Sequence, residues 1–218
     1  MLNIVATPLG NPYDITVRAL EILKICPIII CESTKEASTI LKFHDITGKK
    51  FELLNEHTEP EDVERLMNIC KTQEAVLVSD CGTPGFHDPG YNLIKLCRKN
   101  GIEIKSLPGP SSIALLISLL SERMGTFYFV GFLPQETEKR QREWQRIAKI
   151  KEAIVLMDTP YRLKKMLTEM SEHLGQRKIL IGCDLTLPTE AVIEGPANEV
   201  VKKVPAEKAE FMIWIYPT

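Results

Sequence analysis

The sequence has no run of about 18 apolar residues, so we expect no transmembrane helix. Its longest apolar stretches, residues 25–31 and 113–120, have the length of a buried strand or a short helix. The first residues, MLNIVA, lack the basic flank and the long apolar region of a signal peptide and are typical of a strand. We therefore predict a cytoplasmic protein that has no membrane contact.

Cysteine and histidine are too few and too scattered to predict a disulfide scaffold or a structural metal. The six cysteines form no C-x-x-C pair, and the four histidines have no zinc-like spacing to them. The sequence has no large excess of acidic or basic residues, because the net charge is −2 over 218 residues. This balance excludes a uniformly basic nucleic-acid binder but leaves room for a local basic patch.

The common phosphate and nucleophile motifs are missing. The sequence contains no G-x-x-x-x-G-K-[ST], no G-x-G-x-x-G after the first predicted strand, and no G-x-S-x-G. These absences argue against P-loop NTPases, ordinary Rossmann dehydrogenases, α/β-hydrolases and the common Rossmann-like methyltransferases.

Short apolar runs alternate with helical patterns along the chain, which predicts an α/β fold with a largely parallel sheet. We expect two α/β domains of about five strands each, residues 1–112 and 113–218, with a mixed sheet in the second. Strands are predicted at 2–6, 28–31, 51–54, 75–79, 102–107, 127–130, 153–158, 178–183 and 211–216. The main helices are predicted at 34–43, 60–71, 91–100, 138–149, 161–174 and 198–204.

Three loops rich in glycine and proline each follow a predicted strand. They are TPLGN at 7–11, SDCGTPG at 79–85 and LPGPSS at 107–112. Ligands of open parallel sheets lie outside the carboxyl ends of the strands, where glycine lets the backbone approach them closely. The three loops therefore predict a ligand cleft, although each one is also compatible with an ordinary turn.

These segments carry a family resemblance that spans nearly the whole chain. Residues 4–20 (IVATPLGNPYDITVRAL), 78–90 (VSDCGTPGFHDPG) and 107–112 (LPGPSS) resemble the ordered motifs of the tetrapyrrole methylase superfamily. Residues 131–134 (GFLP) and 159–162 (TPYR) are similar to its bacterial 16S ribosomal RNA ribose 2′-O-methyltransferases. The resemblance implies a homodimeric methyltransferase that binds S-adenosylmethionine in a cleft between two domains and acts on small-subunit ribosomal RNA.

Carried over position by position, the resemblance assigns cofactor-binding residues in both halves of the chain. They are Leu9, Asp80, Thr83, Ser111 and Ser112 in the first half, and Met157, Cys183 and Asp184 in the second. Glu32, at the end of a predicted strand, is our candidate for orienting the substrate hydroxyl, with a solvated or capping acid as the alternative. No metal is implied.

Some positions depart from the pattern of the ribose methyltransferases. CESTK at 31–35 stands where these enzymes have CEDTR, and DTPYR at 158–162 where they have ESPHR. Two alternatives stay open. One, favoured by the acidic pI of about 6.1, is methylation of a small, tetrapyrrole-like molecule. The other, motivated by the changes at Ser33, Lys35 and Tyr161, is a non-catalytic paralogue that binds the cofactor or a partner.

Other polar residues admit both a functional and a structural interpretation. Asp14 suits a helix cap, Cys81 packing, and His87 an exposed loop, while Arg162 suits either a phosphate or a surface ion pair. The basic stretch KRQREWQR at 139–146 suits an RNA grip in which Trp144 stacks on a base. The same stretch also suits an amphipathic helix with Trp144 buried, which we favour.

Overall fold

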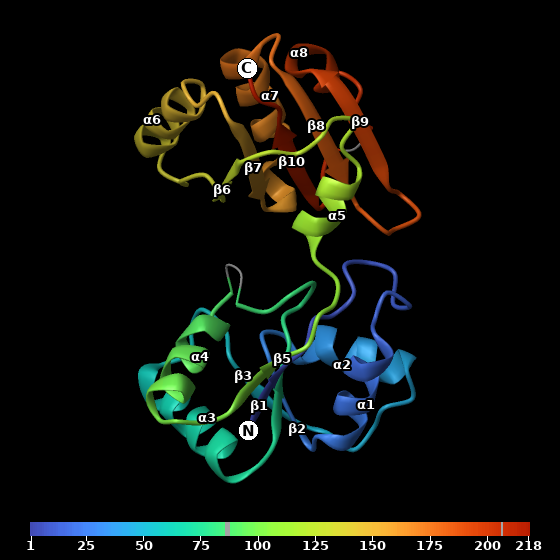
Figure 1. Cartoon of the computed structure of the whole chain (residues 1–218), viewed down its shortest axis with the longest axis vertical. Helices are drawn as coiled ribbons and strands as arrows, with labels where there is room; N and C mark the ends of the chain where they lie inside the picture. The colour runs from blue at the N-terminus through green and yellow to red at the C-terminus, as the bar shows by residue number, and fades with distance from the viewer. Residues whose placement is uncertain (86–87, 206) are drawn as a thin grey trace. The chain divides into compact units, whose positions relative to one another are not determined.

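The computed structural model describes residues 1–85, 88–205 and 207–218, and the chain divides into two compact units, Met1–Ser111 and Ser112–Thr218 (Figure 1). Each unit is built on one five-stranded sheet, the number of strands expected for each half. Within the described residues, every helix is too short or too polar to cross a bilayer.

The first unit has a parallel sheet, as predicted, and the structure shows a helical layer on each of its faces. Its strands lie in the order β3-β2-β4-β1-β5. They are β1 (Leu2–Ile4), β2 (Ile28–Cys31), β3 (Lys50–Leu53), β4 (Ala75–Leu77) and β5 (Ile104–Ser106). β1, β2 and β4 are buried along their whole length, which explains why they appear in the sequence as short unbroken apolar runs.

The four long helices of this unit cover the sheet in pairs. One core cluster joins the sheet to α1 (Val17–Ile25) and α2 (Thr34–Phe43), and a second joins it to α3 (Pro60–Thr72) and α4 (Gly90–Lys99). Local sequence explains where these helices begin. Thr16 caps α1 by accepting a hydrogen bond from the Ala19 N–H, and Pro60 starts α3.

The connections that follow the neighbouring strands β1 and β4 run on opposite faces of the first sheet. The chain passes from β1 into α1 on one face and from β4 into α4 on the other face. Neighbouring parallel strands with this arrangement leave a crevice between their loops at the strands' carboxyl ends, which is where α/β proteins place their ligands.

The second unit is a mixed sheet in the order β6-β7-β10-β8-β9, in which only β6 and β7 pair in parallel. The strands are β6 (Phe127–Gly131), β7 (Ala153–Asp158), β8 (Lys178–Cys183), β9 (Ala191–Pro196) and β10 (Phe211–Ile215). One core cluster packs α6 (Thr137–Ile147), α7 (Leu163–Leu174) and α8 (Ala197–Val200) against this sheet. A second cluster lies on the other face of this sheet and packs α5 (Ser112–Ser118) against it.

Three features of the second unit differ from the sequence prediction. The helix predicted at 198–204 is limited to the single turn of α8, and turn residues follow at 201–203. β9 was not predicted, because a short segment ending in Gly195 and Pro196 has the composition of a turn, and an edge strand tolerates both residues. The predicted helix 161–174 begins instead with a 3₁₀ turn, Pro160–Arg162, before α7.

Candidate active site

The loops that follow β1 and β4 are joined by backbone hydrogen bonds. The Thr7 N–H donates to the Gly82 carbonyl at 2.9 Å, and the Gly82 N–H donates to the Thr7 carbonyl at 3.0 Å. The buried Thr7 hydroxyl also donates to the Ser79 carbonyl at 3.0 Å. Gly82 has a φ of +75°, a conformation that favours glycine. The two loops therefore form one rigid element beside the crevice.

The loop that follows β5 joins the same element. The Thr83 hydroxyl donates to the Pro110 carbonyl at 2.9 Å. Gly109 packs closely against Ala6, two residues after β1. A Cβ added to Gly109 would lie 2.8 Å from the Cβ of Ala6. The Leu9 side chain reaches to 3.2 Å from the position of a Cβ on Gly82. The three loops that the sequence marks separately, with Leu9 and Thr83 among them, are thus brought together.

Glu32 and Asp80 lie at the ends of adjacent strands and contact each other. The Asp80 N–H lies 3.4 Å from Glu32 Oε1, and Asp80 Oδ1 accepts a hydrogen bond from the Ser33 N–H at 3.1 Å. Ser33 in turn caps α2 through the Glu36 N–H. Serine therefore serves as the N-cap at a position where the family pattern has aspartate, another good capping residue.

The electrostatics of this pair are unfavourable to negative charge. Burial, followed by the negative charges of Asp80 and Asp88, raises the pKa of Glu32 to about 7. Burial also raises the pKa of Asp80, and burial together with both carboxylates raises that of the Cys31 thiol to about 11. A cation placed here would relieve this repulsion.

Asp88 is a contributor that we did not single out from the sequence. Its carboxylate accepts hydrogen bonds from the Gly85 N–H at 2.5 Å and the Gly90 N–H at 2.8 Å. It thereby closes the loop at the start of α4, and its charge acts on Glu32. The Asp-Pro-Gly sequence just before a helix was the available signal.

The remaining predicted residues of the first unit lie in or near the loops. Ser111 and Ser112 are half-buried at the start of α5, where the first unit ends and the second begins. Cys81 is exposed, and Asp14 is exposed in the turn before α1. His87 lies outside the described residues.

In the second unit, Met157, Cys183 and Asp184 lie at the carboxyl ends of the inner strands β7 and β8. Met157 and Cys183 flank β10, where they pair with Met212 and Phe211. The Met157 side chain packs with the α5 cluster, whereas the buried Cys183 side chain packs on the opposite face, with the cluster of α6 to α8.

Asp184 begins a turn with an unusual backbone conformation. Its φ is 48° and that of Thr186 is 73°, both in the left-handed region that few non-glycine residues adopt. The Asp184 carboxylate holds this turn by accepting hydrogen bonds from the Glu210 N–H and the Thr189 hydroxyl. The turn is therefore fixed at the end of β8.

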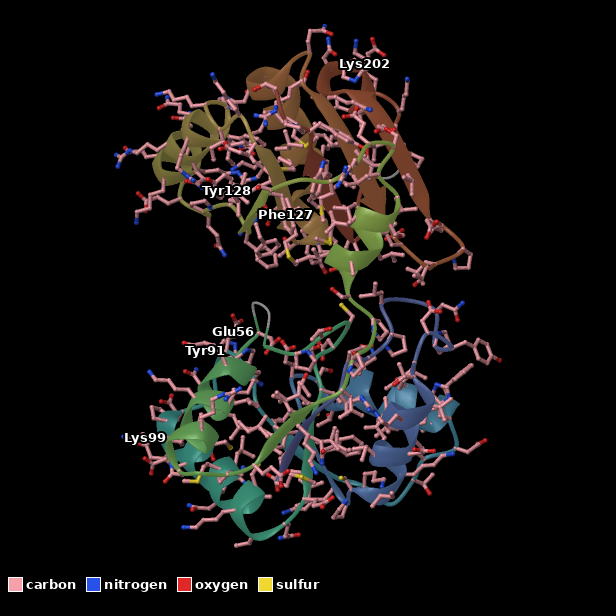
Figure 2. The ribbon with its side chains drawn as sticks, viewed as in Figure 1. Glu56, Tyr91, Lys99, Phe127, Tyr128 and Lys202 are labelled. Atoms are coloured by element: carbon pink, nitrogen blue, oxygen red, sulfur yellow. The ribbon has the colours of Figure 1, made fainter. Side chains whose placement is uncertain are left out.

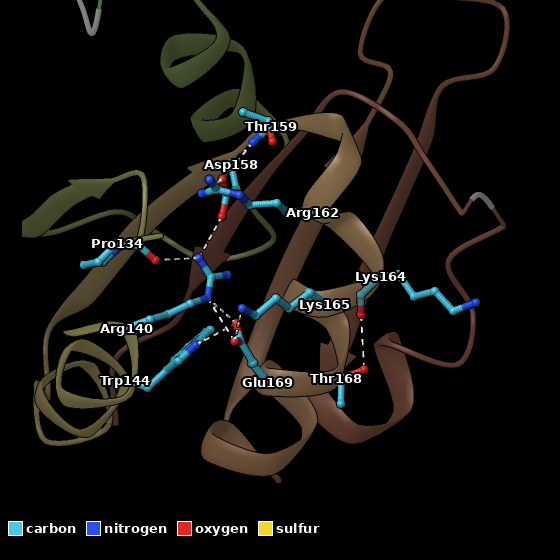
Figure 3. Close-up of polar contacts among 10 residues, drawn as sticks. All are labelled: Pro134, Arg140, Trp144, Asp158, Thr159, Arg162, Lys164, Lys165, Thr168 and Glu169. Carbon is cyan, nitrogen blue, oxygen red and sulfur yellow. Dashed lines mark hydrogen bonds and ion pairs between the residues drawn. The ribbon is translucent and has the colours of Figure 1, made fainter. Parts of the chain in front are cut away.

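The basic stretch 139–146 does not form an exposed RNA grip. Arg140 and Trp144 are buried, at 2% and 0% exposure. Arg140 donates to Asp158 at 3.1 Å and to both oxygens of Glu169, which also accepts from the Trp144 indole N–H (Figure 3). Lys139, Arg142 and Arg146 form surface ion pairs with glutamates of the same segment. The interpretation as an amphipathic helix with Trp144 buried is therefore the one confirmed, and the stacking role is wrong.

The residues of the crevice fit the cofactor that the family resemblance implies. S-adenosylmethionine carries positive charge on its sulfonium and its ammonium group, and the Glu32–Asp80 pair offers carboxylates where negative charge is poorly compensated. Among the described residues, no group of three His, Cys, Asp or Glu side chains is arranged to hold a metal ion.

Comparison with known proteins agrees with this chemistry. Residues 1–201 match the family model described as Tetrapyrrole (Corrin/Porphyrin) Methylases. The chain is 33% identical to the "Ribosomal RNA small subunit methyltransferase I" of Leptospira biflexa over 97% of its length and 89% of the relative's. It is 34% identical to the protein of the same name from Coprothermobacter proteolyticus, over 100% of this chain and 98% of that one.

Solved structures share the fold at low sequence identity. Diphthine synthase superposes with a TM-score of 0.71 at 16% identity, covering 99% of this chain and 89% of its own. The uroporphyrin-III C-methyl transferase from Thermus thermophilus, complexed with S-adenyl homocysteine, gives a TM-score of 0.66 at 15% identity, covering 99% of this chain and 96% of its own. The predicted fold is thereby confirmed.

Proposed function

The chain belongs to the tetrapyrrole methylase family and is an S-adenosylmethionine-dependent methyltransferase, and from this premise we propose that it methylates a ribose 2′-hydroxyl of small-subunit ribosomal RNA. The RNA substrate is supported by the names of relatives that align over almost the whole chain. The motifs at 131–134 and 159–162 support the ribose hydroxyl as the acceptor.

The first-unit loops are the proposed cofactor-binding surface. We assign Asp80 to the positively charged amino-acid end, because its carboxylate lies at the crevice and a cation would offset its repulsion with Glu32. Leu9, Thr83, Ser111 and Ser112 supply apolar contact and hydroxyl groups beside it. In the second unit we assign Met157, Cys183 and Asp184 to the same cofactor, and the carboxylate of Asp184 holds its turn through two hydrogen bonds.

Bound S-adenosylmethionine supplies an electrophilic methyl group, so the acceptor must be a correctly placed and deprotonated oxygen. The single observation that carries our proposal is the placement of Glu32, a partly buried carboxylate after β2 that lies 3.4 Å from the Asp80 N–H and whose pKa is raised to about 7 by burial and by nearby carboxylates. Such a group orients a hydroxyl by accepting its hydrogen bond and takes its proton as the oxygen attacks. The rigid loops around it keep acceptor and cofactor aligned, which is a large part of catalysis by proximity.

We also propose that the enzyme is a homodimer that works in the cytoplasm, as the family resemblance implies. Analytical ultracentrifugation of the purified chain tests the dimer: sedimentation as a monomer at micromolar concentration contradicts it.

The deciding experiment supplies S-adenosylmethionine labelled in the methyl group to the enzyme with 30S subunits from a strain that lacks the modification. We expect label in 16S RNA, at a ribose, when the digested nucleosides are separated by mass spectrometry. The Glu32→Gln variant is expected to transfer label at least about a hundredfold more slowly while it still binds the cofactor. Cofactor binding without RNA labelling would contradict the substrate and favour a small-molecule acceptor or a non-catalytic role.

A further inference from the structure

We propose that the turn Thr159–Arg162, together with Lys208, is a contact surface for single-stranded RNA on which Tyr161 stacks against a base. We call these residues the Tyr161 surface. The inference rests on the proposed function and adds where the second unit meets its RNA substrate, in place of the basic stretch of α6 whose Arg140 and Trp144 are buried.

Tyr161 is the most exposed of the large hydrophobic side chains that the structure describes, at 81%. The ammonium group of Lys208 lies 3.9 Å from the centre of its ring. A tyrosine in this setting is not held by a core, so its ring contributes little to folding. Because Lys208 lies against one face of the ring, the other face can stack on a base. The ammonium group can then bind a phosphate of the same RNA strand.

A buried ionic network in the core of the second unit anchors the turn that carries Tyr161 (Figure 3). The fully buried carboxylate of Asp158 accepts hydrogen bonds from the Thr159 N–H at 2.9 Å, from Arg162 at 3.1 Å and from Arg140 at 3.1 Å. Glu169 holds the other side of Arg140. An exposed aromatic ring on an anchored 3₁₀ turn is pre-organised and loses little entropy when it binds.

Lys208 is the cation that the structure places at the ring. The other cations of the turn and of the start of α7 are engaged by acids: Arg162 by the buried Asp158, Lys164 by Glu207 at 3.4 Å and Lys165 by Glu169 at 4.0 Å. Lys208 is exposed beside the ring and its charge also acts on Glu210. An exposed ring with an exposed cation against it is the combination that binds single strands, since a phosphate meets the cation and a base meets the ring.

Fluorescence anisotropy with a labelled 12-nucleotide single-stranded RNA of mixed sequence tests the surface directly. We expect Tyr161→Ala to weaken binding by about tenfold and Tyr161→Trp to restore it, because stacking depends on the ring and not on the hydroxyl. Lys208→Ala should weaken binding and reduce the slope of log K against log salt by about 0.7, the value for one lost phosphate contact on a single strand.

Two matched variants separate this surface from general charge and aromaticity. Tyr128→Ala removes an exposed tyrosine of β6, labelled in Figure 2, and Arg142→Ala removes an exposed cation of α6. Both are expected to leave the RNA affinity within about twofold of the parent. Equal losses in Tyr161→Ala and Tyr128→Ala, or in Lys208→Ala and Arg142→Ala, would overturn the inference. So would tighter binding of an acidic peptide than of RNA.

The outcome is distinguishable from failure of the proposed function. Methylation of 30S subunits by the parent, with an unchanged rate in Tyr161→Ala at limiting RNA, would refute the Tyr161 surface and leave the function standing. RNA binding that requires Tyr161, without methylation of ribosomal RNA by the parent, would refute the proposed substrate and leave the surface standing. Calorimetry of S-adenosylmethionine is expected to give the same affinity for all four alanine variants.

Discussion

The backbone N–H of Asp80 points at the carboxylate of Glu32 from 3.4 Å, while the side-chain carboxylate of Asp80 raises the pKa of the same Glu32. One residue therefore both supports and opposes the negative charge of its neighbour. This arrangement keeps a protonatable carboxylate at the end of β2, beside loops that hydrogen bonds hold rigid. It suits a site that receives a cationic cofactor and a neutral hydroxyl.

Replacement of Asp80 should weaken cofactor binding. We expect Asp80→Asn to lower the affinity for S-adenosylmethionine by about ten- to a hundredfold, the effect of losing a hydrogen bond between charged groups. Calorimetric titration measures it, with Glu56→Gln, an exposed acid outside the loops, as the control. An Asp80→Asn affinity equal to that of the parent would remove Asp80 from the proposed site.

The pH dependence of the reaction should report Glu32. As pH rises through about 7, Glu32 loses its proton and becomes able to accept one, so kcat/KM for S-adenosylmethionine should rise to a plateau above pH 7. In Glu32→Gln the rate should be low and independent of pH over the same range. A parent profile that is flat from pH 5.5 to 8.5 would argue that Glu32 orients the substrate without taking its proton.

The same carboxyl makes folding stability depend on pH. Its pKa of about 7 in the folded state lies above the ordinary value of 4.5, so the folded state holds the proton more tightly. This contribution is fully present below pH 4.5 and is lost as pH rises through 7. The parent should therefore lose stability between pH 5 and pH 8, whereas Glu32→Gln should not. We expect the unfolding free energy of Glu32→Gln minus that of the parent to grow by about 1–2 kcal/mol over this range, a value reduced because water screens a partly exposed carboxylate.

Urea denaturation at both pH values measures this difference. A constant gap between the two proteins would show that Glu32 titrates at its ordinary pKa in the folded state.

The buried network of the second unit should contribute far more to stability than the ion pairs beside it. Arg140→Ala removes one of the two arginines that pair with the buried Asp158 and also one partner of Glu169, so we expect a loss of about 3–5 kcal/mol. Arg142→Ala removes an exposed pair with Glu138 and should change stability by less than about 0.5 kcal/mol. Equal midpoints in urea for the two variants would contradict the buried network.

The elements predicted most accurately are those whose apolar residues recur at a regular spacing along the chain. Residues 34–43 were predicted as a helix and 153–158 and 178–183 as strands, with the same limits as in the structure. Their apolar spacing and their capping residues are local properties. β9 was missed because its pairing with β8, and not its composition, makes it a strand.

The sequence by itself determined the α/β class, the three loops and the family, since each depends on residues that lie within a few positions of one another. Only the tertiary structure decided that the Glu32 carboxylate meets Asp80 from 48 positions away, and that Arg140 turns inward to Asp158 and Glu169. The physical reason is that charge and burial depend on partners brought together by the sheet order. A basic stretch shows in the sequence, whereas the acids that neutralise it show only in the fold.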